Sequence, residues 1–151
     1  AASDVYKRQE KNGVPAEIVM KTETSQAGDI NQHIFEEMGR FVEMNGHYYI
    51  RFEESYDDGK VPVMVKITSD NRVHLTRFGD QHKTNLVFDS DQATYTKLNT
   101  PAGPAEIKVE TRSLDIAYHE KPFSGQVDIS YRLEMNGQKL GDYQIQFNFT
   151  T

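Results

Sequence analysis

The chain contains no cysteine and no tryptophan, and the first absence excludes several kinds of site. Without thiols there can be no disulfide framework, no thiolate zinc centre and no cysteine nucleophile. A protein without disulfides suits a reducing compartment, so we expect a cytoplasmic location. Eight tyrosines and eight phenylalanines supply the large side chains in a chain of 151 residues.

Positive charge is also scarce, with 17 Lys and Arg against 23 Asp and Glu and a formal net charge of −6. Proteins that bind the phosphate backbone need clustered Lys and Arg, so a nucleic-acid partner is disfavoured. No apolar run approaches the roughly 18 residues of a membrane-spanning helix, and no charged-then-apolar leader precedes the domain. We therefore expect neither a nucleic-acid nor a membrane partner; the oligomeric state stays open.

Motifs for catalysis and cofactor binding are missing too. The five histidines are scattered without metal-ligand spacing, and no phosphate-binding glycine loop or nucleophile elbow occurs. We therefore expect no cofactor, no metal site and no catalytic residue. Enzymatic activity is left open but disfavoured.

The first nine residues, AASDVYKRQ, show neither alternation nor helical periodicity, and the chain does not begin with Met. Residues 4–9 read like the translated end of a sequencing-library adapter. We interpret residues 1–9 as a non-native or disordered leader and residues 10–151 as a single β-barrel domain.

From Val14 onward, apolar residues recur at every second position, which is the period of a half-buried β-strand. Eight to ten strands and no helix are expected. Two Asn-Gly dipeptides, at Asn45 and Asn136, predict type I′ hairpin turns. Residues 25–31 are interpreted as a loop, and Gly39 as a bulge or a sharp bend.

Short connections make consecutive strands neighbours, which predicts an up-and-down antiparallel meander. A meander of this length must close or fold over, because open edges invite aggregation. We therefore predict a single closed antiparallel β-barrel. A two-sheet β-sandwich is the alternative.

A series of short motifs follows in order along the chain: GRFV at 39–42, YYIRFEE at 48–54, RFG at 77–79, YT at 95–96, TPAG at 100–103 and GQVDISY at 125–131. Together they resemble the YwiB-like family of bacterial proteins, a domain-of-unknown-function group found mostly in Firmicutes. The likeness covers Val14 to Phe149. It implies a lipocalin-like (calycin) barrel in the cytoplasm and no established activity. Ala102 stands where the family pattern has an aromatic residue, so any role of that aromatic is in doubt here.

Two charged side chains continue apolar faces. Arg77 follows Val73 and Leu75, and Glu54 follows the stripe that begins at Tyr48. Both should point inward near strand ends, where an unpaired charge is costly. The structural interpretation is an Arg77–Glu54 ion pair that closes one end of the barrel, together with Tyr56 or Tyr95. The functional interpretation is that Arg77 grips the carboxylate or phosphate of a ligand.

Three functional hypotheses remain. In the first, the barrel binds a small, partly apolar or anionic molecule at Arg77, Glu54, Tyr56 and Tyr95. In the second, a protein–protein adaptor with a packed interior binds its partner through an edge strand or through the outer face that carries Arg51, Tyr49, His74 and Phe78. The third, an enzyme, rests only on analogy with other lipocalin-like barrels.

Overall fold

The alternating segments of the sequence form ten β-strands in the computed structural model, which describes residues 13–80 and 83–151. The interpretation of residues 1–9 as a leader lies outside these ranges. The strands are β1 (Val14–Gln26), β2 (Asp29–Met44), β3 (His47–Tyr56), β4 (Gly59–Ile67), β5 (Val73–Phe78), β6 (Lys83–Phe88), β7 (Thr94–Thr100), β8 (Gly103–His119), β9 (Ser124–Met135) and β10 (Gln138–Thr150). No helix in the described part of the chain is long and apolar enough to cross a membrane.

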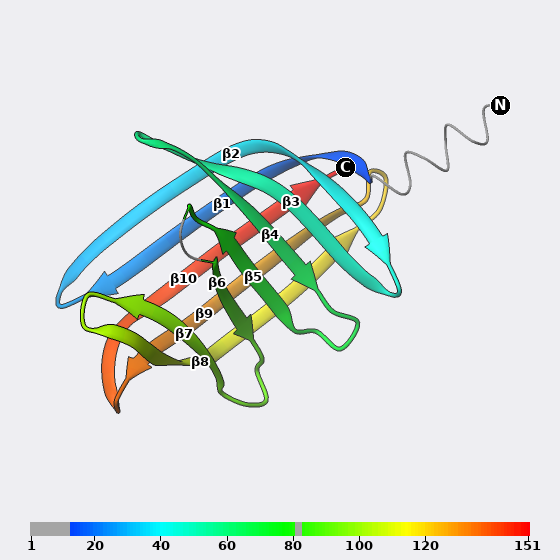
Figure 1. Cartoon of the computed structure of the whole chain (residues 1–151). Coiled ribbons are helices and arrows are strands. Elements are labelled where there is room, and N and C mark those ends of the chain that lie inside the picture. The colour runs from blue at the N-terminus through cyan, green and yellow to red at the C-terminus, as the bar shows by residue number, and fades with distance from the viewer. Residues whose placement is uncertain (1–12, 81–82) are drawn as a thin grey trace.

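All strand pairs are antiparallel, and hydrogen bonds join the strands in the order β6-β5-β4-β3-β2-β1-β10-β9-β8-β7. The first and last strands pair with each other, so the meander curls into a barrel (Figure 1). The predicted β-barrel is confirmed, and the β-sandwich alternative is wrong. Between β6 and β7 no backbone ladder forms among the described residues; there the Thr94 hydroxyl donates to the Val87 carbonyl at 2.5 Å.

Two-residue turns set the register of the long hairpins. Asn45-Gly46 and Asn136-Gly137 have positive φ at both positions, as a type I′ turn requires. The segment expected to be a loop at residues 25–31 is instead another such turn, at Ala27-Gly28, with φ of 51° and 85°. The first two strands therefore continue almost to the turn, paired from Val14–Phe41 to Gln26–Asp29.

Gly39 marks a departure of β2 from β3. A Cβ atom at this position would lie 2.3 Å from the Arg51 carbonyl oxygen, so the two backbones approach too closely for any side chain. The β2–β3 ladder stops at the next pair, Arg40–Arg51, and the preceding residues of β2 pair only with β1. The ladder with β1 runs through Gly39 without a shift, so this glycine marks a close approach and a bend, and not a bulge.

The core fills the middle of the barrel and one of its ends. Side chains from β1, β4, β5, β6, β9 and β10 leave a central void of only about 10 Å³. The end near the β2–β3 and β8–β9 turns is plugged by a cluster of aromatic rings with centroids 5.3–5.9 Å apart: Phe41, Tyr48, Tyr118, Phe123 and Phe149. The opposite end, at the β1–β2, β3–β4 and β9–β10 turns, carries polar side chains and is called the mouth (Figure 1).

Candidate functional site

A buried ion pair lies at the mouth. Arg77 on β5 donates from Nε to Glu54 Oε1 at 2.7 Å and from Nη2 to Glu54 Oε2 at 3.1 Å, a bidentate arrangement. Glu54, on β3, is 0% exposed, and the side chain of Arg77 is 29% exposed. Two strands that are not neighbours thus place their inward side chains in contact, as the alternation of both strands predicted.

Tyr56 completes the pair. Its hydroxyl donates to Glu54 Oε1 at 3.0 Å, and its ring packs edge-on against Phe35. Burial, then the charge of Glu54 and the hydrogen bond to it, raise the pKa of Tyr56, so the phenol remains a donor at neutral pH. Tyr95 does not join this group. It is 63% exposed on β7, at a position paired with Lys108, and the suggestion that it contacts the ion pair is wrong.

The electrostatics of the pair favour the charged form of Arg77. Burial opposes the charge, but the hydrogen bonds and negative charge of Glu54 outweigh it, and the pKa of the guanidinium is raised. The positive charge is therefore already balanced by a carboxylate. Glu54 takes up Nε and Nη2 of Arg77, and Nη1 lies outside this bidentate pair.

A cavity of about 270 Å³ opens beside Arg77 at the mouth. Its lining combines hydroxyl groups with aliphatic side chains: Thr22, Thr24, Arg77, Thr84, Leu86, Leu98, Tyr131, Leu133, Tyr143 and Ile145, with Glu23 and Gln144 at the rim. Tyr131 and Tyr143 stack with ring centroids 5.1 Å apart. Burial, above all, raises the pKa of Tyr131, so its hydroxyl is neutral at physiological pH.

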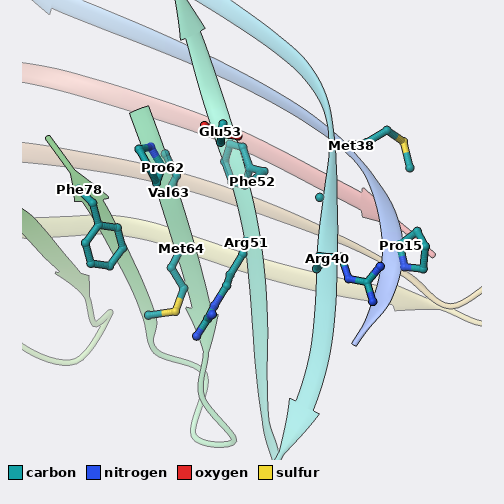
Figure 2. Close-up of a pocket in the computed structure, with 11 residues that line it drawn as sticks. Pro15, Met38, Arg40, Arg51, Phe52, Glu53, Pro62, Val63, Met64 and Phe78 are labelled. Carbon is teal, nitrogen blue, oxygen red and sulfur yellow. The ribbon is translucent and has the colours of Figure 1, made fainter. Parts of the chain in front are cut away.

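A second hollow lies on the outer surface and is called the outer groove (Figure 2). It has a volume of about 720 Å³ and is lined mainly by apolar atoms from β1 to β5. Figure 2 shows Arg51, Met64 and Phe78 on three neighbouring strands, with Arg40 and Pro15 on the far side. Of the residues expected on an outer binding face, Arg51 and Phe78 line this groove.

No group of three His, Asp or Glu side chains in the described residues could hold a metal ion. His74, on the outer face of β5, is half-buried, and burial followed by the charges of Lys66 and Arg72 lowers its pKa. Its imidazole is therefore neutral at physiological pH.

The comparisons with known proteins agree with this architecture. A family model described as Domain of unknown function (DUF1934) matches residues 18–147, which include the ion pair and most of the mouth. The chain belongs to this family. A relative from Bacillus subtilis (strain 168), named Uncharacterized beta-barrel protein YwiB, is 27% identical over 113 residues, 74% of this chain and 77% of the relative.

A solved structure gives the same fold. The crystal structure of ywiB protein from Bacillus subtilis superposes with a TM-score of 0.73 at 22% identity and covers 90% of both chains. The resemblance to the YwiB-like family is confirmed. The family is described as a domain of unknown function, and the relative as an uncharacterized β-barrel, so any activity must be argued from the geometry.

Sequence reasoning missed several residues of the mouth. Thr22 and Thr24 continue the inward face of Ile18 and Met20, so the signal that identified Arg77, a polar residue on an apolar face, was present there as well. Tyr131 lies in a perfectly alternating strand, and its hydroxyl was not considered. The outer groove had no such signal, because it depends on where β2 and β3 separate.

Proposed function

We propose that this barrel binds a small, partly apolar molecule in the cavity at its mouth. The observation that carries the proposal is the contrast between a packed barrel centre and a hydroxyl-lined cavity directly above it. Ligand sites are typically concave and largely apolar, with a few polar groups that fix orientation. At about 30 Å³ per water molecule, the cavity has room for roughly nine waters, so the ligand is small.

The ion pair selects among ligand classes. An anion would compete with Glu54, which already occupies Arg77 in a bidentate manner. A neutral carbonyl or hydroxyl oxygen can instead accept a hydrogen bond from Nη1 without separating two buried charges. Tyr143 Oη accepts from Gln26 Nε2 at 2.7 Å and keeps its own proton to donate. Of the two ligand classes inferred from the sequence, this arrangement favours the neutral, partly apolar one.

Binding can be tested with three six-carbon probes, namely hexanamide, 1-hexanol and hexanoate, followed by NMR shifts of the protein. We expect the amide and the alcohol to shift mouth resonances with dissociation constants in the range of about 1–20 mM, as ligands of this size allow. A response to hexanoate alone would assign Arg77 to an anion and refute the neutral class. No response to any probe would refute the site.

Two tryptophan variants of neighbouring residues give a matched control. Leu98→Trp fills part of the mouth and introduces a tryptophan into a chain that has none, so the probes should bind at least ~5-fold more weakly. Lys97→Trp places the same side chain on the outer face of β7, where we expect unchanged binding. An equal loss of probe affinity in both variants would contradict the location of the binding site at the mouth.

The alternative function is a protein–protein adaptor that uses the outer face. The outer groove favours it, because Phe78 and Met38 expose apolar surface there. If the chain is cross-linked to a partner protein in native cells, Arg51→Glu should then abolish the cross-linked product, whereas Leu98→Trp should leave it unchanged. The cytoplasmic location is likewise a proposal, which fractionation of native cells would test.

A further inference from the structure

The separation of β2 from β3 leaves a strand edge open. Residues 29–39 of β2 pair with β1 on one side, while the β2–β3 ladder includes only residues 40–44. Beyond Gly39, the structure gives two side-chain contacts between these strands: a hydrogen bond from Ser55 Oγ to Glu37 Oε1 at 2.5 Å and the edge-on packing of Phe35 against Tyr56. Within the described residues, this half of β2 is therefore an edge strand, although it lies inside the strand order.

The turn geometry identifies which backbone groups face the open side. A two-residue hairpin makes its flanking residues a hydrogen-bonded pair, so Gln26–Asp29 is such a pair, and odd-numbered residues of β2 bond to β1. The Met44–His47 pair flanks the next turn, so even-numbered residues bond to β3. The N–H and C=O groups of the even-numbered residues from 30 to 38 consequently point to the open side.

Along this edge the outer face alternates apolar and polar side chains, and the apolar ones are exposed. Ile30, Ile34 and Met38 are 63%, 62% and 64% exposed and lie on the outer face, at every fourth residue. Natural edge strands are usually protected by lysine, proline or a bulge. The open half of β2 contains none of these, and its ladder with β1 is regular. Such an edge is suited to pairing with another strand.

The order of the residues specifies the partner. In an antiparallel pair of two β2 strands with a two-fold axis at Ile34, Ile34 faces itself, Ile30 faces Met38, and Gln32 faces Glu36. Apolar residues meet apolar residues, and no two like charges are opposed. We propose that two copies of this chain associate through these edges, in an isologous dimer with one sheet continuous across the interface.

The outer surface has room for the partner strand. Beside the edge, Glu36, Met38, Glu53 and Lys60 line a groove of about 670 Å³ where β2 and β3 diverge. With the two-fold axis at Ile34, the partner's Ile30 lies beside Met38, which lines this groove. The paired edges would exchange about ten backbone hydrogen bonds, an interface at the small end of the range for specific complexes, so we expect a dissociation constant in the micromolar range.

Charge swapping at the two-fold axis tests the register. Because Ile34 faces its own copy, Ile34→Lys and Ile34→Glu each place two like charges opposite one another and should weaken self-association at least ~10-fold. An equimolar mixture of the two variants should restore the dimer, because Lys then faces Glu. Because Lys and Glu are nearly equal in mass, one variant is labelled uniformly with a heavy nitrogen isotope, so that native mass spectrometry distinguishes the mixed dimer by mass; sedimentation equilibrium gives the dissociation constants.

Met44→Lys and Met44→Glu are the matched controls. Met44 lies on the same strand and the same face and is 51% exposed, but β3 covers its edge, so these variants should self-associate like the unmodified chain. A monomeric unmodified chain up to ~1 mM would overturn the proposal. So would unchanged association of Ile34→Lys, or a mixture of the two Ile34 variants that stays monomeric. Binding of the hexanamide probe at the mouth is measured separately, so failure of one proposal leaves the other standing.

Discussion

The Arg77–Glu54 pair offers the sharpest test of how the mouth is built. We consider Arg77→Met, which keeps the aliphatic bulk of the arginine but removes its charge, and Glu54→Gln, which keeps the shape of the carboxylate. Because Glu54 is fully buried, Arg77→Met leaves a carboxylate with only the Tyr56 hydroxyl as a donor. Glu54→Gln instead leaves a guanidinium that is 29% exposed and can be hydrated through the mouth.

The two variants should therefore lose different amounts of unfolding free energy. Removing one partner of a buried pair costs about 3–5 kcal/mol when the remaining charge stays buried, which is the expected loss for Arg77→Met. For Glu54→Gln we expect about 1–2 kcal/mol, because the guanidinium regains water and the amide still offers one acceptor. With a urea m-value of about 2 kcal/mol/M, Arg77→Met lowers the unfolding midpoint by about 1.5–2.5 M.

Urea titration followed by far-ultraviolet circular dichroism measures the free energy of unfolding of the two single variants and of the double variant. The double variant should be more stable than the sum of the single losses predicts, with a coupling energy of at least about 2 kcal/mol. A loss below about 1 kcal/mol for Arg77→Met, or a coupling energy near zero, would refute the assignment of the pair as the structural closure of the mouth.

Three further predictions follow from single positions. Gly39→Ala should destabilise the fold by about 1–3 kcal/mol in urea titration, because its Cβ would overlap the Arg51 carbonyl oxygen; a neutral result would contradict the close approach of β2 and β3. Ala27→Gly should stabilise by about 0.5–1 kcal/mol, because Ala27 has φ of 51°, and a loss of stability would argue against the type I′ turn. Burial raises the pKa of Tyr118 to about 12, so the folded protein keeps a proton that the unfolded chain releases near pH 10, and stability should fall as the pH rises from about 10 to 12. Tyr118→Phe should reduce that fall in thermal melts, and an identical pH dependence would contradict the effect of partial burial on this phenol.

The sequence predicted the barrel and the ion pair because both depend on alternation. Successive residues of a strand point to opposite faces, so Val73 and Leu75 fix the direction of Arg77, and Ile50 and Phe52 fix that of Glu54. The pairing of the two charges then follows from the cost of burying either one alone. For these residues, the local sequence pattern and the cost of an unpaired buried charge were sufficient to predict the contact.

The sequence-based predictions were wrong or missing where the alternation of apolar and polar residues does not determine the structure. In β7, Tyr95 and Leu98 are an odd number of residues apart and must lie on opposite faces; only the packed structure shows that Leu98 is the inward one. The separation of β2 from β3 depends on a contact between Gly39 and a carbonyl group of another strand. No pattern within β2 encodes that contact, so the outer groove and the open edge could not be predicted.

The missing ladder between β6 and β7 has a consequence for the cavity at the mouth. Leu86 on β6 and Leu98 on β7 line that cavity from the two sides of the gap, where the structure gives the Thr94 hydroxyl bond to Val87 in place of a ladder. Where neighbouring strands of the wall are paired, widening it would break several backbone hydrogen bonds at once. Parting β6 from β7 would cost the Thr94–Val87 hydrogen bond but no ladder of the sheet, so we expect the cavity to widen at this gap at a lower energetic cost than between paired strands.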